Sequence, residues 1–261
     1  MLAKITSAVQ ARVKNRMDRK PLSVLQKNIE QSPTPRNFTA ALTPRTASEI
    51  RIIAEIKRAS PSAGNLRPDL STAKLAAGYQ KTGAAAISVL TEEDYFRGGL
   101  VDLSEVKKTV NIPVLQKDFI LEPYQVYESR AAGADAILLI TAIHTPEKLR
   151  ELYNLSVSLG LTPLVEIHAE QELETALALD ARVIGINNRN LKTLKTDLDT
   201  GYRLLSLMPR EKIAVVESGL KTRTEIQAFR KAGASAFLIG ETLLRAPDPS
   251  LALRDLLSRQ D

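Results

Sequence analysis

Short apolar runs recur along the chain from residue 52 to near its end, and a longer amphipathic stretch follows each of them. Eight runs can be distinguished, and they begin near Ile52, Ala84, Ile112, Ala134, Thr162, Arg182, Ile213 and Ser235. Their short length and β-branched content are typical of buried strands. The stretches between them predict helices, among them residues 71–82, 123–132, 146–159 and 222–232. Pro at a helix start and Gly just after its end, as at Pro123 and Gly133, are the expected punctuation of such helices.

The regular alternation of strands and helices indicates the fold class. Eight strand-helix units predict an α/β protein with a (β/α)8 TIM barrel, a fold of about 250 residues that suits this chain. A doubly wound sheet is the alternative. That fold is expected to carry a glycine-rich phosphate fingerprint after its first strand, and none follows Lys57. We assign the barrel to residues 49–261.

The preceding residues, 1–48, predict a helical extension packed on the barrel. Leu2, Ile5, Val9 and Val13 recur at three- and four-residue steps and form an apolar stripe. The first 30 residues also carry seven Lys or Arg against two Asp or Glu, within a net charge of +6 for the whole chain. Such basic positions are typical of the solvated face of a helix, although a transit peptide or a nucleic-acid-binding helix would share the pattern. Aromatic residues make up 4% of the chain, too few for a base-stacking platform, so we expect no nucleic-acid partner.

Composition excludes several other classes of protein. The chain has no cysteine, which excludes disulfides, a thiolate nucleophile and cysteine-based metal sites. No apolar run approaches the roughly 18 residues of a membrane span, and the N-terminus lacks the features of a secretory signal. We therefore expect a cytoplasmic protein with no membrane partner. His144 and His168 follow two of the runs without matching ligands, so we predict loop positions for them and no metal site.

Polar and charged residues stand where the apolar runs stop. They are Glu55, Lys57, Lys117, Glu166, Asn187 and Ser218. A charge at the end of a buried strand is costly to desolvate unless it is paired or used in chemistry. In a barrel of this kind the strands end at one rim, where catalytic groups sit, so we expect these side chains to converge. Ion pairs that merely line the barrel interior are the alternative.

Glycines after the last two runs raise the question of phosphate binding. Gly219 and Gly240 stand at the strand ends where barrels often hold a phosphate through backbone amides. Simple turn chemistry is the alternative at both positions. Glu241 follows the second glycine, so its side chain is expected to turn away while its amide contributes. The segment from Ser60 to Gly64 is small and polar, the character of a mobile loop or of a plain connector.

The longer segments around these positions are AEIKRASPSAG (54–64), AISVLTEEDYFRGG (86–99), VLQKDFILEPYQVYESRAAGADAILLI (114–140), PLVEIH (163–168), IGINNRNL (184–191), VVESG (215–219) and LIGETLLRAPDP (238–249). Together they closely resemble the indole-3-glycerol phosphate synthase family, the ring-closing enzymes of tryptophan biosynthesis. The resemblance covers nearly the whole chain. It includes PLSVL and NFTAAL in the extension, which argues against a transit peptide. Related isomerase and imidazole-forming barrels share the phosphate site but lack this set of charged residues.

The resemblance implies a reaction and roles for three residues. The family converts 1-(2-carboxyphenylamino)-1-deoxyribulose 5-phosphate to indole-3-glycerol phosphate with loss of carbon dioxide and water. Lys117 matches the family's general acid for ring closure. Glu166 matches the residue used in the dehydration, with Lys57 as its partner and as a contact to the substrate carboxylate. Neither a cofactor nor a metal is expected, because no step needs a redox centre or an electron sink.

The resemblance also implies positions around the substrate. Glu55 would hold Lys57 or Lys117, and Asn187 would fix the substrate. Ser218 would support the side of the site where Asn187 lies. Arg189 would pair with an acidic group or with the substrate carboxylate. The remaining expected contacts are Phe96, Phe119, Leu138 and Leu191 around the aromatic ring, and Ser60, Gly219, Gly240 and Glu241 around the phosphate. The expected partner is a small sugar-phosphate substrate, and we expect a monomer or weak homodimer.

Two other functions use the same residues differently. A lysine in a barrel can form a Schiff base with a sugar-phosphate carbonyl, as class I aldolases do, and borohydride would trap that adduct. A non-catalytic barrel that binds sugar phosphates or nucleic acid through its basic N-terminal helix is the second alternative. Its binding to a polynucleotide would fall steeply with salt.

Overall fold

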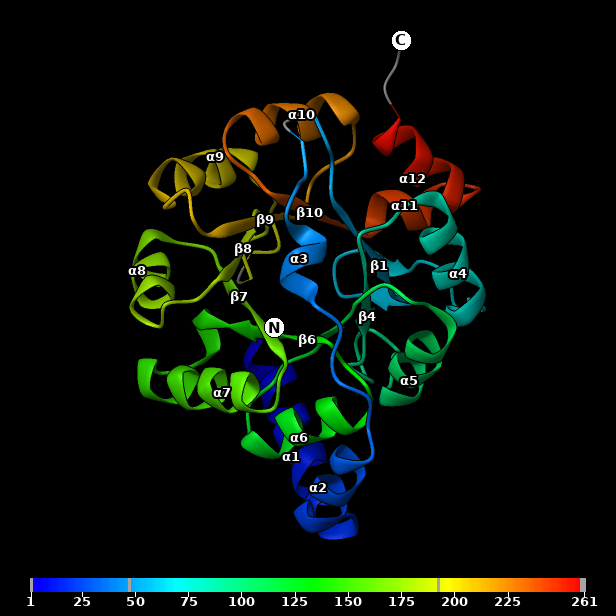
Figure 1. Cartoon of the computed structure of the whole chain (residues 1–261), viewed down its shortest axis with the longest axis vertical. Helices are drawn as coiled ribbons and strands as arrows, with labels where there is room; N and C mark the ends of the chain where they lie inside the picture. The colour runs from blue at the N-terminus through cyan, green and yellow to red at the C-terminus, as the bar shows by residue number, and fades with distance from the viewer. Residues whose placement is uncertain (1, 47, 192, 259–261) are drawn as a thin grey trace.

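The computed structural model describes residues 2–46, 48–191 and 193–258. Eight parallel strands lie at its centre: β1 (Ile52–Ile56), β4 (Ala86–Leu90), β5 (Val114–Lys117), β6 (Ala136–Ile140), β7 (Thr162–Ile167), β8 (Val183–Asn187), β9 (Ile213–Glu217) and β10 (Ala236–Ile239). They close into a barrel in the order β1-β10-β9-β8-β7-β6-β5-β4 (Figure 1). The predicted TIM barrel is confirmed. Several strands begin one or two residues later than their apolar runs, since residues such as Ala84 and Ala134 still belong to the preceding turns.

Helices surround the strands, as Figure 1 shows. They are α4 (Thr72–Thr82), α5 (Leu100–Thr109), α6 (Pro123–Ala131), η1 (Thr141–Ile143), α7 (Pro146–Ser158), α8 (Glu170–Ala178), α9 (Leu198–Leu207), α10 (Arg223–Lys231), α11 (Glu241–Arg245) and α12 (Pro249–Leu257). The expected punctuation is present at their ends. The side chain of Thr222 caps α10 in a reciprocal box with Glu225, and Gly83 ends α4 in the left-handed conformation with φ 105°.

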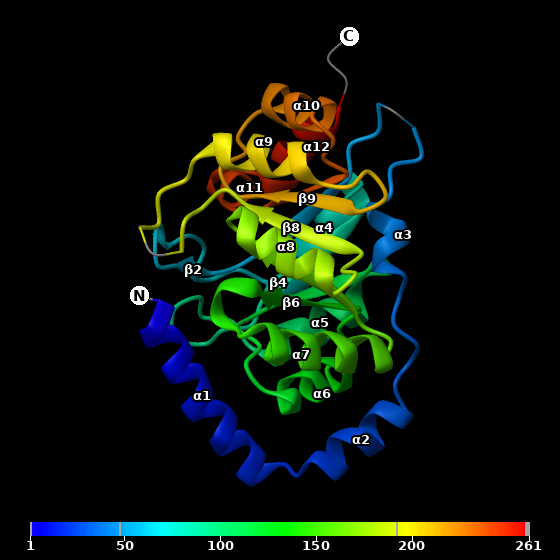
Figure 2. The same ribbon diagram turned by 90° about the vertical axis from the view of Figure 1, so that its left-hand side faces the viewer.

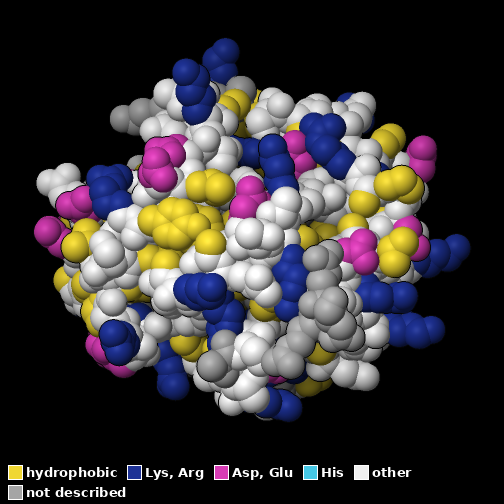
Figure 3. Space-filling model, turned by 90° about the horizontal axis from the view of Figure 1, so that it is seen from above, with side chains coloured by type: hydrophobic (Ala, Val, Ile, Leu, Met, Phe, Trp, Pro, Cys, Tyr) yellow, Lys and Arg dark blue, Asp and Glu magenta, His cyan; other side chains and the backbone are white. Residues whose placement is uncertain are grey.

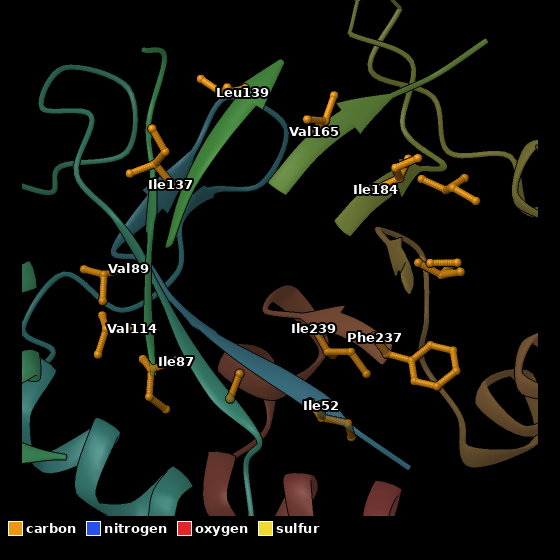
Figure 4. Packing of buried hydrophobic residues seen from close by; sticks show 14 of the residues in the cluster. Ile52, Ile87, Val89, Val114, Ile137, Leu139, Val165, Ile184, Phe237 and Ile239 are labelled. Atoms are coloured by element: carbon orange, nitrogen blue, oxygen red, sulfur yellow. The ribbon is translucent and has the colours of Figure 1, made fainter. Parts of the chain in front are cut away.

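Strand residues alternate between two apolar layers. Ile87, Val89 and Leu139 belong to the layer between the strands and the helices (Figure 4). Leu115 and Leu164 belong to the layer that fills the barrel interior. Because side chains on a strand repeat every second residue, a residue two positions beyond an inward apolar side chain also points inward. This rule determines which strand-end groups reach the barrel mouth.

The N-terminal extension consists of α1 (Leu2–Arg19), α2 (Leu22–Glu30) and α3 (Phe38–Leu42). Figures 1 and 2 show that it wraps around one side of the barrel, with α1 and α3 at opposite ends. The predicted apolar stripe of α1 is buried at Ile5, Val9 and Val13. Phe38 and Leu42 of α3 are fully buried and close the end of the barrel away from the strand C-termini.

The carboxylate of Asp135 fixes the linker between α2 and α3. Asp135 is fully buried and lies just before β6. It accepts hydrogen bonds from the backbone N–H of Arg36 at 2.6 Å and of Val114 at 2.8 Å, and it pairs with Lys107 at 2.5 Å. One buried carboxylate thus joins the extension, a strand and α5, which stabilises the closed end of the barrel.

Three further observations concern the loop after β1, the helices and the charged surface. The segment expected to be a mobile loop or a connector forms a small antiparallel hairpin of β2 (Ala59–Ser60) and β3 (Gly64–Asn65). No helix in the described part of the chain is long and apolar enough to cross a membrane. Over α9, α10 and α12, basic side chains are interspersed with acidic ones (Figure 3).

Candidate active site

The C-terminal ends of the strands surround a cavity of about 790 Å³. Inward side chains of the strands reach it by the two-residue rule: Lys117 follows Leu115 on β5, and Glu166 follows Leu164 on β7. The candidate residues that line the cavity are Glu55, Lys57, Phe96, Lys117, Phe119, Leu138, Glu166, Asn187, Arg189, Leu191, Ser218, Gly219, Gly240 and Glu241. The expected convergence on one rim is therefore present for every candidate except Ser60.

Lys117 lies between two buried carboxylates. Its Nζ is 3.1 Å from Oε2 of Glu166 and 3.2 Å from Oε2 of Glu217. Burial alone would lower the pKa of Lys117, but attraction from Glu166, Glu217 and Glu55 outweighs burial and raises the pKa above its usual value. Lys117 therefore carries its proton before any substrate arrives.

The surroundings of the two carboxylates that contact Lys117 shift their pKa values in opposite directions. Burial and repulsion from Glu166 raise the pKa of Glu217. Burial also opposes ionisation of Glu166, but Lys117 and His168 together lower the pKa of Glu166 well below its usual range. The difference follows from the second cation, since His168 Nε2 lies 3.3 Å from Oε1 of Glu166.

Glu55 pairs with Lys57, with 2.5 Å between Oε1 and Nζ. The sequence left open whether Glu55 would hold Lys57 or Lys117, and the direct contact is with Lys57. Neighbouring glycines make room for these carboxylates. A Cβ on Gly240 would lie 2.4 Å from Oε1 of Glu55, and one on Gly185 would lie 2.3 Å from Oε1 of Glu217. Both glycines are thus required by close approach rather than by turn geometry.

The ends of β8 and β9 are held by amide and carbonyl groups. The Oδ1 atom of Asn187 accepts the backbone N–H of Arg189 at 2.9 Å. Ser218 adopts φ 67°, a strained conformation for a residue with a side chain, and its carbonyl accepts a hydrogen bond from Asn188 at 3.0 Å. Arg189 was expected to pair with an acidic group or with the substrate carboxylate, and its guanidinium lies 3.3 Å from Glu241.

An apolar wall lies beside these charges. The rings of Phe96 and Phe119 are 6.4 Å apart between centroids and inclined by 43°. Phe96 belongs to the loop of residues 91–99, which the buried side chain of Glu92 organises by accepting the N–H groups of Tyr95 at 2.7 Å and Phe96 at 3.2 Å. Arg12 of α1 pairs with Glu92. The prediction that the basic residues of this helix form a solvated face is thus wrong for Arg12.

Three of the expected phosphate contacts differ in how their backbone and side chains are arranged. Gly219 has φ 84°, and a Cβ there would come within 2.5 Å of Thr196, so this turn excludes a side chain. Glu241 turns its carboxylate toward Arg189 and toward Arg245, whose Nε lies 2.9 Å away, as expected for a residue that offers only its amide. Ser60 is buried in the hairpin, where its hydroxyl accepts the N–H of Ala63 at 3.1 Å. Its contact with phosphate stays a prediction.

Comparison with known proteins identifies the family. A family model described as indole-3-glycerol phosphate synthase matches residues 2–256. The chain belongs to the indole-3-glycerol phosphate synthase family. The resemblance read from the sequence is confirmed, and so is the expected activity class, a carboxy-lyase of tryptophan biosynthesis.

Individual relatives of the indole-3-glycerol phosphate synthase family match end to end. An indole-3-glycerol phosphate synthase from Polaromonas naphthalenivorans is 43% identical over 257 residues, which cover 98% of each chain. One from Dehalococcoides mccartyi is 46% identical over 249 residues, 94% of this chain and 95% of the relative. Among solved structures, thiamine phosphate pyrophosphorylase from Pyrococcus furiosus superposes with a TM-score of 0.59 at 14% identity, over 80% of this chain and 95% of the other. At that identity the likeness shows the barrel fold alone.

Sequence reasoning missed two residues of this indole-3-glycerol phosphate synthase site. Glu217 ends β9 two residues after the inward Val215, so the rule that selected Glu166 also selects it. His168 was predicted to be a surface or loop residue without matching metal ligands. It does follow β7, but its ring contacts Glu166. In the described residues, no group of three or more His, Cys, Asp or Glu could hold a metal ion.

Proposed function

We propose that this chain closes the indole ring of 1-(2-carboxyphenylamino)-1-deoxyribulose 5-phosphate and releases carbon dioxide and water, with Lys117 as the general acid. The observation that carries this assignment is the position of Lys117. Its ammonium group lies between Glu166 and Glu217 at the barrel mouth, beside an apolar wall that suits an aromatic ring. A protonated amine at that point can meet a ketone oxygen while the aromatic ring rests on Phe96 and Phe119.

Ring closure requires an acid because negative charge develops on the ketone oxygen. The aromatic carbon that bears the carboxylate attacks the ketone carbon, and Lys117 donates its proton to the oxygen. The raised pKa of Lys117 supports this role, since an acid must hold its proton until the reaction begins. A positioned general acid contributes about 10²- to 10⁴-fold to the rate.

The later steps use the neighbouring charges. The carboxylate leaves as carbon dioxide, which restores the aromatic ring. A hydroxyl then takes a proton from a donor and departs as water, while a base removes the anilino proton. Glu166 suits the base because its low pKa keeps it ionised. Lys57 would contact the substrate carboxylate, and Glu55 would hold Lys57 in place through their 2.5 Å contact.

The substrate is an anion of about −2.5 to −3 at neutral pH, because it joins a carboxylate to a phosphate monoester. We propose that the amides of Gly219, Gly240 and Glu241 hold the phosphate, with Ser60 from the hairpin. Asn187 and Ser218 would fix the substrate between the phosphate and the ring, and Arg189 would orient the same wall. Catalysis without a cofactor, a cytoplasmic location and a monomer or weak homodimer stay predictions from the sequence.

The experiment that tests the proposal is a fluorescence assay of indole product in EDTA, comparing wild type with Lys117→Ala. The proposal expects product from wild type and a loss of at least about 10²-fold in kcat for the variant. Circular dichroism and the unfolding midpoint check that the variant is folded, and Lys117→Met provides a second variant that keeps the side-chain volume. A folded wild type that forms no indole product would overturn the proposed function.

Borohydride separates this function from a Schiff-base mechanism. A Schiff base needs an unprotonated amine, whereas the carboxylates around Lys117 favour its ammonium form. We therefore expect no covalent adduct after treatment with substrate and borohydride. Mass spectrometry that found an adduct at Lys117 or Lys57 would favour the aldolase-like reaction instead.

A further inference from the structure

The ring of His168 lies between two carboxylates that come from different elements. Its Nε2 is 3.3 Å from Oε1 of Glu166 on β7, and its Nδ1 is 3.3 Å from Oε2 of Glu172 on α8. The ring is largely buried, with 12% of the side chain exposed. His168 lies immediately after the end of β7, two residues beyond Glu166. The general acid-base steps described above make no use of it.

We propose that His168 is a positioning residue for Glu166, which holds one carboxylate oxygen so that the other faces Lys117 and the substrate. This inference rests on the proposed function, since a positioning role for His168 requires that Glu166 act as the base. The two oxygens of Glu166 are divided accordingly: Oε1 faces the imidazole at 3.3 Å, and Oε2 faces the ammonium of Lys117 at 3.1 Å. A carboxylate held from both sides cannot rotate freely, so its base lone pairs stay directed at the cavity.

The charges around the ring support a second effect. Burial alone would lower the pKa of His168, but Glu166 and Glu172 raise it to about 9. At neutral pH the ring is therefore an imidazolium. Lys117 from β5 and His168 favour ionisation of Glu166, whereas Glu217 repels its charge. Glu217 from β9 shares Lys117 but does not contact His168, and its pKa is raised. His168 thus favours the ionised form of Glu166, the proposed base.

A purely structural role for His168 makes a different prediction. The backbone N–H of His168 donates to Oε2 of Glu172 at 2.6 Å, and this contact organises the start of α8. Any residue except proline at position 168 keeps that N–H. The ring is therefore not needed for the turn, and its removal should alter Glu166 rather than the fold of α8.

NMR titration tests the contact without any need for activity. The chain has two histidines, so His144→Gln assigns the ring signals by removing one set. We expect His168 to titrate near pH 9 in wild type, well above the ordinary value of about 6.5. In Glu166→Gln the titration should move down by about one unit or more, because one of the two carboxylates is gone. Titration near 6.5 in wild type, unmoved by Glu166→Gln, would overturn the proposal.

Kinetics test the consequence for catalysis. His168→Gln keeps a nitrogen donor but no charge, whereas His168→Asn is too short to reach Glu166. Without the cation, the pKa of Glu166 rises, so we expect the acidic limb of kcat to move to higher pH by about one unit or more in both variants. KM should change little, and kcat at the plateau should fall further in His168→Asn than in His168→Gln. His144→Gln is the matched control and should keep the wild-type profile.

The outcomes separate the inference from the function on which it rests. Unchanged pH profiles and unchanged kcat in both His168 variants would overturn the positioning role, whether or not the NMR contact is present. If wild type forms no indole product, the proposed function fails and the catalytic role fails with it. The NMR titration would then still report whether the ring pairs with Glu166. Should both variants fold poorly, the titration of His168 in Glu166→Gln keeps the inference falsifiable.

Discussion

Buried carboxylates at the two ends of the barrel differ in how fully they are hydrogen-bonded. At the closed end, Asp135 receives two backbone hydrogen bonds and pairs with Lys107. At the open end, Glu217 contacts Lys117 at 3.2 Å, yet neither of its oxygens receives a well-aligned hydrogen bond from the described residues. Since buried charges are costly unless they are satisfied, the first arrangement stabilises the fold. The second leaves a carboxyl group directed at a cavity where a substrate can complete its contacts.

The largest difference between the ends should appear when a charge is removed at the mouth. Glu166→Gln keeps the shape of the side chain but cannot accept a proton as a carboxylate does. We expect kcat to fall by about 10²- to 10⁴-fold while product affinity, measured by fluorescence titration, stays close to wild type. Glu170→Gln, on the exposed start of α8, is the control and should be fully active. Full activity of Glu166→Gln would move the dehydration role to another residue.

Removing a charge at the closed end should lower the stability of the fold and leave the activity unchanged. Asp135→Ala removes the acceptor of two backbone N–H groups and leaves Lys107 without its carboxylate. We expect the free energy of unfolding in urea to fall by about 3 kcal/mol, with kcat and KM unchanged in the folded protein. Asp180→Asn removes a charge that is 95% exposed and keeps a side chain that tolerates φ 55°, so it should change stability little. A loss of turnover in Asp135→Ala would show that the two ends are coupled.

The same contrast shows what the sequence could predict. The eight apolar runs predicted the barrel fold. Charges at the ends of these runs identified Glu55, Lys117 and Glu166, whose side chains point inward because side-chain direction repeats every second residue. Glu217 obeyed the same rule but was read only as part of a glycine turn. Which lysine pairs with which glutamate could not be predicted, since β5 and β7 are not neighbours and their side chains meet across the barrel interior.

Two side-chain contacts could not be predicted from the local sequence. His168 has a partner two residues away in sequence, but a lone histidine after a strand gives no indication that its ring turns back. Ser60 stood in a segment typical of a mobile loop or a connector, yet its hydroxyl accepts a hydrogen bond within the hairpin of β2 and β3. Side-chain orientation in short loops depends on tertiary contacts, which periodicity does not report.

A smaller effect is expected where backbone makes room for charge. Gly240→Ala places a Cβ 2.4 Å from Oε1 of Glu55, so Glu55 must move and its contact with Lys57 must lengthen. We expect kcat to fall by about tenfold, the effect of misplacing one supporting group by a fraction of an ångström. Gly99→Ala is the control, because its nearest neighbour would lie 3.9 Å away. Equal activity of both variants would exclude a role for the Glu55 position in turnover.

The smallest effect is expected from the ion pair that joins α1 to the barrel mouth. Arg12 on α1 pairs with the buried Glu92, which organises the loop that carries Phe96. Arg12→Met keeps much of the side-chain volume but leaves Glu92 without its cation, so the loop should open more often. We expect KM to rise by about three- to tenfold, equivalent to roughly 1 kcal/mol, while kcat changes little.

Lys14→Met is the matched control for Arg12→Met, because Lys14 is exposed on the same helix and should leave KM unchanged. Limited proteolysis within residues 91–99 should be faster in Arg12→Met alone, which ties the kinetic effect to the loop. If KM and proteolysis stayed at wild-type values, α1 would act at the mouth only as a cover for apolar side chains. The ion pair would then resemble the stabilising contacts of the closed end, and the functional contrast between the two ends would be confined to the strand-end charges.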